Sequence, residues 1–371
     1  MVDRSSDVSQ VLADIFGRRR EDIEAEFGQE FWHDKRHLGA RVARDRCRLL
    51  SKHILDVTDA YGKTVLDLGC GVGIYSIYMA ALGAKRVVAV DHLVQDVEIA
   101  RRIHSRLDPP LTGFSAEALD VLRLPFPDGS FDVVTCRDAI SHIRDPRAAL
   151  TEMHRVARKG GLLWLQDGNN ALEVRGHGKR RLHWRRLEYG PLPELGQRSA
   201  ESTCVCACAS TTREGGSEEE LQWGLGGRNL PYFAMRREMI HQRFPLLDGA
   251  TLDLLAEETK GMWGQRLLDA VQAYLNGGAI SAGGPYVCRN PATGEINEGE
   301  FNPFKLAQML REIGFSSRIV RPYYAPRLAV RDGRPTAREF AHYLGGHAIR
   351  VFYPATVFLA TTFEIRAMKP H

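Results

Sequence analysis

Three aspartates stand where predicted strands end, and the first of them leads into a glycine-rich turn. Asp67 lies in the apolar run VLDL at residues 65–68, Asp91 follows the run RVVAV, and Asp120 follows a short predicted strand near 112–116. Because the carboxyl ends of parallel strands share one edge of a sheet, we expect the three carboxylates on the same ligand-binding edge. Carboxylates accept hydrogen bonds from hydroxyl, amino and ammonium groups, so the pattern predicts a ligand rich in such donors.

The turn after Asp67 carries Gly69, Gly71 and Gly73 at alternate positions, whereas a dinucleotide-binding loop reads Gly-x-Gly-x-x-Gly. Glycine adopts positive φ and lets a ligand approach the backbone closely. Asp67 would repel a pyrophosphate, but it suits a ligand with an ammonium group. Asp91 comes eighteen residues after Gly73, where a carboxylate can accept both hydroxyls of a ribose. Without a phosphate-binding lysine, these residues indicate a nucleoside that carries an amino acid.

Alternating strands and helices are needed to position these residues. From residue 63 onward the apolar patterns alternate between strand and helix, with helices predicted near 74–82, 93–107 and 146–157. This alternation predicts βαβ units and a parallel sheet with helices on both faces. The rhythm stops after Asn170 and returns near the end of the chain, so we expect one sheet domain interrupted by a long insertion.

The composition of the chain is that of an ordinary globular protein. Its 371 residues include 44% hydrophobic and 26% charged side chains, and the net charge of +4 is too small to imply a nucleic-acid or membrane partner. No stretch approaches the roughly 18 apolar residues of a membrane helix, and the polar start predicts no signal peptide. Seven scattered cysteines fit reduced thiols, so we expect a cytoplasmic location.

Several stretches, taken in this order, resemble the class I S-adenosylmethionine-dependent methyltransferases, most closely the small-molecule branch that includes quinone-biosynthesis enzymes. They are VLDLGCGVG, VVAVD, AEALDVLRLPFPDGSFDVV, CRDAISHIRDPRAALTEMHRVARKGG and NPFKLAQMLREIGF. The resemblance covers about residues 61–170 and 301–371. It implies S-adenosylmethionine as the cofactor and transfer of its methyl group to an O, N or C atom of a small-molecule acceptor (EC 2.1.1.-).

The implied fold is α/β, a Rossmann-like, doubly wound, seven-stranded sheet with an N-terminal helical segment and a long, mainly helical insertion. We expect the helical segment at 1–60 and the cofactor-binding half of the methyltransferase core at 61–170. An inserted acceptor or lid region is expected at 171–300, and the core is completed by 301–371.

The resemblance also implies roles for the residues of the glycine turn and of the next strand. Asp67 and Gly69 would face the methionine moiety of the cofactor, and Cys70 and Gly71 would form the loop beneath it. Asp91 would bind the ribose hydroxyls.

Four further positions complete the implied cofactor site. His92 would lie beside the adenine, Asp120 would accept a hydrogen bond from the adenine amino group, and the amide of Val121 would meet a ring nitrogen. Arg137, just after the fourth strand, would border the sulfonium and the acceptor.

A general base is needed only where the acceptor must lose a proton in the transition state. The candidate is His142, in AISHIRDP after the fourth strand, because the unperturbed pKa of imidazole lies near neutrality. Structural packing is the alternative role for this histidine. Asp167 and Asn170, past the fifth strand, are further candidates for the rim of the site or for capping a loop.

The basic run RGHGKRRLHWRR at 175–186 leaves other readings open. It could grip the phosphates of RNA or meet an anionic small substrate, although a solvated helix face is the reading we favour. An RNA or protein methyltransferase and a catalytically silent, cofactor-binding regulatory protein are therefore the alternatives. Nucleic-acid methylation is disfavoured, because CRDAISH stands where base-amine methyltransferases carry an Asn/Asp-Pro-Pro-aromatic turn.

The stretch STCVCACAS places Cys204, Cys206 and Cys208 at alternate positions. This spacing, without a histidine partner, does not match structural zinc sites, and we predict a loop and no metal. The sequence leaves open the identity of the acceptor, the use of a base, the oligomeric state and the role of these cysteines.

Overall fold

The structure is a computed structural model and divides into two units. The first contains Met1–Ile140, Asp145–Glu173 and Phe301–His371, and the second contains Ser141–Arg144 and Val174–Glu300. The described residues are 3–28, 39, 42, 45–168, 170–173, 177–190, 230–280, 289–294, 299–320, 357–360 and 362–371. The cysteine stretch at 202–210 and the start of the basic run, 175–176, lie outside them.

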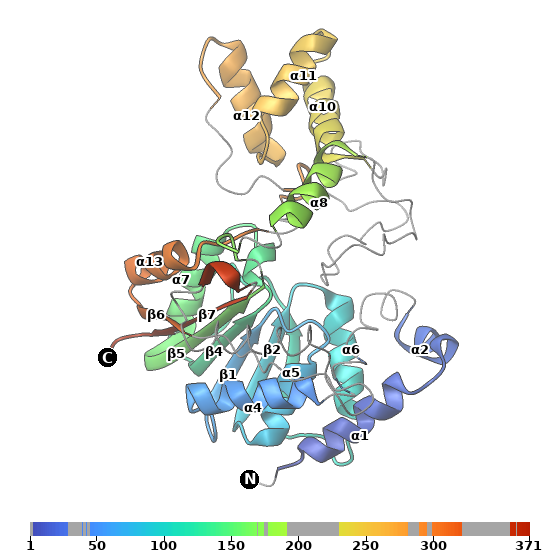
Figure 1. The fold of residues 1–371 in the computed structure, drawn as a ribbon, viewed down its shortest axis with the longest axis vertical. Coiled ribbons are helices and arrows are strands. Elements are labelled where there is room, and N and C mark those ends of the chain that lie inside the picture. Colours follow the sequence, from blue (N-terminus) through green and yellow to red (C-terminus); the bar gives the residue numbers. More distant parts are fainter. Residues whose placement is uncertain are drawn as a thin grey trace, which may run out of the picture. The chain divides into compact units, whose positions relative to one another are not determined.

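A seven-stranded sheet forms the centre of the first unit (Figure 1). Its order is β3-β2-β1-β4-β5-β7-β6; β7 is antiparallel to both neighbours and the other pairs are parallel. The strands are Thr64–Leu68 (β1), Arg86–Asp91 (β2), Phe114–Ala118 (β3), Phe131–Arg137 (β4), Ala157–Asp167 (β5), Ser316–Val320 (β6) and Phe363–Met368 (β7). This sheet confirms the predicted α/β, Rossmann-like fold class.

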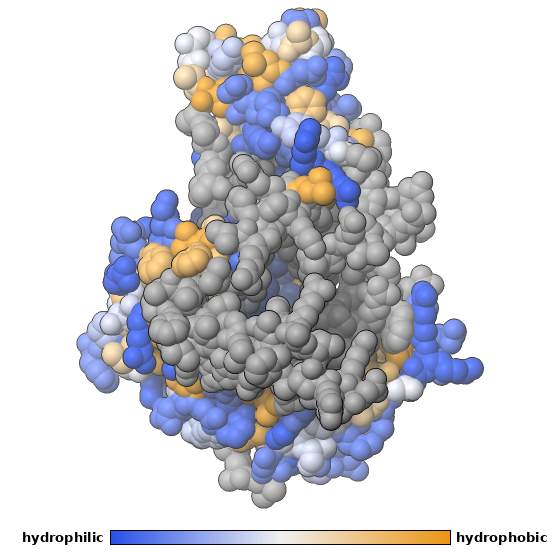
Figure 2. Space-filling view, in the orientation of Figure 1, coloured by the Kyte–Doolittle hydropathy of each residue, from blue (hydrophilic) through white to orange (hydrophobic). Residues whose placement is uncertain are grey.

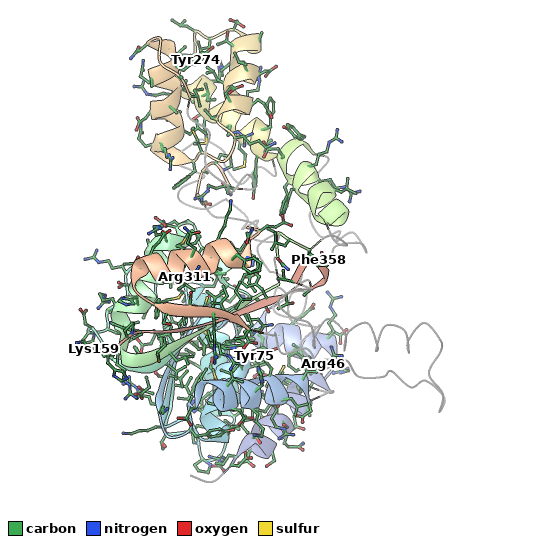
Figure 3. The ribbon with its side chains drawn as sticks, turned by 60° about the vertical axis from the view of Figure 1, so that its left-hand side comes forward. Arg46, Tyr75, Lys159, Tyr274, Arg311 and Phe358 are labelled. Atoms are coloured by element: carbon green, nitrogen blue, oxygen red, sulfur yellow. The ribbon has the colours of Figure 1, made fainter. Side chains whose placement is uncertain are left out.

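Helices cover both faces of the sheet, as predicted. Figure 3 marks the two sides by Arg46, on α4, and Arg311, on α13. The helices of this unit are α1 (Ser5–Phe16), α2 (Arg20–Phe27), α4 (Arg46–Thr58), α5 (Ile74–Leu82), α6 (Val94–Ser105), α7 (Pro146–Val156) and α13 (Pro303–Ile313). Helix α7 begins where sequence signals place it, because Asp145 accepts a hydrogen bond from the Ala148 amide at 3.0 Å and a proline follows at the first helical position.

The first helices join the same core as the sheet. Val8, Leu12 and Ile15 of α1 are buried in the cluster that contains the apolar residues of α4 and α5. Glu26 of α2 accepts hydrogen bonds from Arg18 and from Arg106, which directly follows α6. Burial alone would raise the pKa of Glu26, but the two guanidinium groups hold it below its usual value.

The second unit is a helical cluster of its own. It contains α8 (His177–Tyr189), α10 (Tyr232–Arg243), α11 (Gly249–Glu258) and α12 (Gly264–Leu275), packed around buried residues such as Ile240 and Leu255. A buried ion pair between Glu188 and Arg236 ties α8 to α10. Arg236 also donates from Nε to the Ala256 carbonyl at 2.7 Å.

Apolar side chains appear on the outside of the helical unit among hydrophilic ones (Figure 2). The most exposed is Leu246, at 97%, between α10 and α11. In the parts of the chain that the structure describes, we find no helix that combines the length and apolarity needed to cross a bilayer. The cytoplasmic location stays a prediction.

Asp132 links the starts of β1 and β4, and we expect this link to make stability depend on pH. Its Oδ2 accepts from the amide and the hydroxyl of Thr64, each at 2.7 Å, and Oδ1 pairs with Arg158. Burial raises the pKa of Asp132, but the Thr64 hydrogen bonds and Arg158 outweigh it and lower the pKa overall. A carboxyl whose folded-state pKa is lowered stabilises the protein above its unfolded pKa, near 3.9, and this contribution disappears as the pH falls.

We therefore expect Asp132→Asn to lower the free energy of unfolding by about 1–2 kcal/mol at pH 7. The difference from wild type should shrink as the pH falls below about 4, because both proteins then carry a neutral group at this position. Urea unfolding at several pH values measures this difference in the free energy of unfolding. Asp128→Asn is the control, since Asp128 is 80% exposed in its pair with Arg155. An equal gap at pH 7 and pH 3 would contradict the link.

Candidate cofactor-binding site

The glycine turn between β1 and α5 is held against the end of β2. Gly69, Gly71 and Gly73 all have positive φ, at 71°, 53° and 71°. The amide of Gly69 donates to the Val90 carbonyl at 2.8 Å, and the amide of Gly71 donates to Asp91 Oδ2 at 2.8 Å. The turn therefore has a fixed shape that ordinary L-residues rarely adopt.

The three glycines differ in what surrounds them. A Cβ on Gly69 would lie 2.2 Å from the Ala139 Cβ, and one on Gly73 would lie 2.7 Å from the Ala100 Cβ. Among the described residues, a Cβ on Gly71 would meet only the Asp96 carboxylate, at 3.6 Å, which is an ordinary van der Waals contact. Gly69 and Gly73 are thus needed for packing, whereas Gly71 faces space that a ligand can fill.

Asp67 is buried between the sheet and α5. Its Oδ2 accepts from the Ser76 hydroxyl at 2.5 Å and its Oδ1 from the Thr135 hydroxyl at 2.7 Å. Burial raises the pKa of Asp67, with the two hydroxyls and Arg137 opposing it in part. Both oxygens are therefore engaged with the protein itself. Sequence reasoning missed Ser76 and Thr135, because neither belongs to the glycine motif.

Asp91 lies at the carboxyl end of β2 and organises the turn. Besides the Gly71 amide, it accepts from the Leu93 amide at 3.1 Å, and His92 Nδ1 lies 3.3 Å from its Oδ1. Burial raises its pKa, but His92 and the two amides outweigh this and lower the pKa overall. Asp91 is thus a charged carboxylate at neutral pH, with lone pairs left for a ligand.

The structure brings Asp120 and Val121 to the same edge. The Leu119 amide, next to them, donates to the Asp91 carbonyl at 2.9 Å. Asp120 is exposed and accepts from the Leu122 amide at 2.9 Å, which shapes the turn after β3. The loops after β2 and β3 therefore lie side by side.

Arg137 ends β4, and Tyr75 of α5 orients it. The guanidinium lies 3.9 Å from the centre of the Tyr75 ring and donates to Asp138 Oδ2 at 2.5 Å. Burial would lower the pKa of Arg137, but Tyr75, Asp138 and Asp67 outweigh it and raise the pKa overall. Tyr75 was not among the predicted site residues; its position as the second residue of α5, directly after the glycine turn, is the signal that could have found it.

Cys70 is not suited to nucleophilic chemistry. Burial, together with Asp91, Asp67 and Asp96, raises the pKa of its thiol well above the usual value. A thiol of high pKa carries little thiolate at neutral pH. The predicted place of Cys70 in the loop beneath the methionine moiety stays a prediction.

The candidates beyond β4 and β5 divide between the two units. His142 belongs to the second unit, so its predicted role as a base rests on its place in the chain. Asn170 is fully buried and donates from Nδ2 to the carbonyls of Val357 and Ala360, each at 2.7 Å, which is a structural role. Asp167 is also fully buried, at the end of β5.

Comparison with known proteins shows which family the region around this site resembles. Residues 66–165 match the family described as Methyltransferase domain. The chain is 38% identical over 117 residues to the mitochondrial ubiquinone biosynthesis O-methyltransferase of Schizosaccharomyces pombe, covering 31% of this chain and 41% of that protein. The ubiquinone biosynthesis O-methyltransferase of Xanthomonas campestris is 37% identical over 108 residues, covering 29% of this chain and 44% of that enzyme.

Among solved structures, a SAM-dependent methyltransferase from Aquifex aeolicus is 25% identical, with a TM-score of 0.32, over 35% of this chain and 70% of that one. This chain spans less than half the length of the two curated relatives. The family match at residues 66–165 includes the glycine turn and the ends of β2 and β4 described above. The chain thus carries, at residues 66–165, a methyltransferase domain of the class I S-adenosylmethionine-dependent family.

Proposed function

We propose that this protein transfers a methyl group from S-adenosylmethionine to an oxygen atom of a small-molecule acceptor. The observation that carries the proposal is the turn at Gly71, where an added Cβ would clash with no described atom and which lies against the charged Asp91 carboxylate. The relatives named above are O-methyltransferases by name, which supports oxygen as the acceptor atom. We propose a cytoplasmic location with it.

Each strand end has a part in holding the cofactor. Asp91 accepts the ribose hydroxyls through the lone pairs that Gly71 and Leu93 leave over. The exposed Asp120 takes the adenine amino group, with the Val121 amide and His92 alongside. In the same proposal, Asp67 and Gly69 border the methionine moiety, and Cys70 completes the loop.

When bound, the cofactor supplies a methyl group already activated by the positive sulfonium. The work left to this chain is to align the acceptor and to exclude water. The charged Asp91 carboxylate gives this edge a negative character that suits a cation. If the acceptor hydroxyl must lose its proton in the transition state, His142 is the residue to test as the general base.

Asp91→Ala should weaken the binding of S-adenosylhomocysteine by more than tenfold. The carboxylate is the acceptor for the ribose hydroxyls, and a hydrogen bond to a charged group contributes about 1.5–3 kcal/mol. Titration calorimetry at pH 7.5 measures the affinity, with the melting temperature recorded for each variant. Asp128→Ala serves as the control because it removes an exposed carboxylate from the same unit.

Unchanged affinity in a folded Asp91→Ala variant would refute the ribose assignment. Wild-type protein that does not bind S-adenosylhomocysteine at all would refute the proposed function.

A further inference from the structure

Three polar residues form a row across neighbouring strands at the carboxyl edge of the sheet. Arg137 of β4 is paired in register with Gln166 of β5, and Gln166 is paired with Glu364 of β7. Side chains at paired positions point to the same face, and neighbouring strands lie about 5 Å apart. We call Arg137, Gln166 and Glu364 the polar row. Thr135, two residues before Arg137 on β4, lies on the same face of the sheet, and its hydroxyl donates a hydrogen bond to Asp67.

The middle of the polar row lacks a hydrogen-bond partner. Gln166 is 9% exposed, and its Oε1 is buried without a partner in the part of the chain that the structure describes. Leaving a buried acceptor unpaired costs free energy, so native proteins seldom do it outside functional sites. Gln166 therefore calls for a hydrogen-bond donor that comes from a ligand.

Arg137, at one end of the polar row, has donors to spare. Tyr75 covers one face of the guanidinium and Asp138 takes one hydrogen bond. A guanidinium carries five N–H donors, and among the described residues we find no other acceptor bonded to it. Tyr75 and Asp138 thus fix its orientation while its remaining donors can meet a ligand oxygen.

Glu364, at the other end, is a buried carboxylate that forms an ion pair with Arg366. It is fully buried on β7, accepts from Arg366 Nε at 3.1 Å, and lies 3.7 Å from His53 Nε2 of α4. These contacts hold the carboxylate beside Gln166. A carboxylate ligand has no proton to donate, so placed against Gln166 it would leave Oε1 unpaired beside a second acceptor, Glu364.

We propose that Arg137 and Gln166 recognise a hydroxyl group of the acceptor and set the specificity of the enzyme for hydroxylated compounds. A hydroxyl oxygen accepts a hydrogen bond from the guanidinium, and the same hydroxyl donates its O–H to Gln166 Oε1. A hydroxyl group therefore satisfies both residues at once. A carboxylate serves Arg137 but leaves Gln166 unpaired and faces Glu364. An amine serves Gln166 but gives Arg137 no strong acceptor.

This inference rests on the proposed function, and the test separates the two. The protein is first saturated with S-adenosylhomocysteine, and calorimetry confirms that the complex forms. Phenol, benzoate and aniline, which differ in the polar group on one ring, are then compared by ligand-observed NMR titration. We expect phenol to bind at least tenfold more tightly than benzoate or aniline. In Gln166→Leu we expect this preference to fall to less than threefold, with the affinity for S-adenosylhomocysteine unchanged.

Gln308→Leu is the matched control. Gln308 lies on the exposed surface of α13, where it bonds Glu312, and its loss should leave the preference for phenol intact. Benzoate or aniline binding as tightly as phenol, none of the three binding, or a preference that survives Gln166→Leu would overturn the inference. Failure to bind S-adenosylhomocysteine would instead count against the proposed function.

Discussion

Arg236→Ala is expected to destabilise the helical second unit by about 3–5 kcal/mol, because it leaves a buried carboxylate without its cation. Arg236 is 0% exposed and Glu188 is 3% exposed. The pair joins α8 to α10, and the lost Nε–H also served the Ala256 carbonyl of α11. Hydrogen–deuterium exchange over residues 232–258 measures the effect as faster exchange, while the strands of the first unit should exchange as before.

The neighbouring Arg237 provides the control. It pairs with Asp253 at 2.7 Å, but the two side chains are 42% and 57% exposed, and such pairs contribute less than about 1 kcal/mol. Arg237→Ala should therefore leave the exchange nearly unchanged. The double variant Arg236→Met with Glu188→Leu should recover most of the lost stability, since it removes both buried charges. Equal effects at the two arginines would show that the Glu188 pair is not the main contact.

Substitution of two glycines of the same turn is expected to have opposite effects: Gly69→Ala should mainly reduce stability, and Gly71→Ala should mainly reduce ligand affinity. Gly69→Ala should lower the free energy of unfolding by about 2–5 kcal/mol, because it adds overpacking against Ala139 to the strain of a positive φ. Gly71→Ala should cost only about 1–2 kcal/mol, since its new Cβ makes an ordinary contact with the Asp96 carboxylate at 3.6 Å and no clash. That Cβ would occupy the space assigned to the ligand, so binding of S-adenosylhomocysteine should drop more than tenfold.

Urea unfolding and calorimetry on both variants test this prediction, and wild-type protein sets the reference. The loss of stability should be larger for Gly69→Ala, and the loss of affinity per folded molecule larger for Gly71→Ala. If Gly71→Ala binds the ligand as wild type does, Gly71 does not face the cofactor. If both variants are equally stable, the contact with Ala139 relaxes at little cost.

Much of the fold could be predicted from the sequence because its signals are local. The apolar run ending at Asp67 and the turn at Gly69 specify a strand and its exit without reference to the rest of the chain. The third strand was expected near 112–116 and lies at Phe114–Ala118, since a short strand at the edge of a sheet has weak periodicity.

The contacts within the site could not be predicted, because they depend on the order of the strands. The polar row pairs Gln166 with Glu364, and no spacing in the sequence reveals that β7 lies beside β5. The stacking of Arg137 on Tyr75 likewise depends on how α5 crosses the sheet. The sequence could therefore propose single residues at strand ends, whereas it gave no sign of their partners on other elements.

The place of β7 has a consequence for the order in which the sheet can be assembled during synthesis. The strands β1 to β5 are complete at Asp167, and they can pair as soon as they have been made. The outer edge of β5 then stays open until Phe363–Met368 arrives, and β6, made earlier, has no neighbour before β7. An open edge of apolar residues such as Leu163 and Leu165 invites pairing with other chains. The nascent protein thus passes through a long interval in which aggregation competes with the insertion of its last strand.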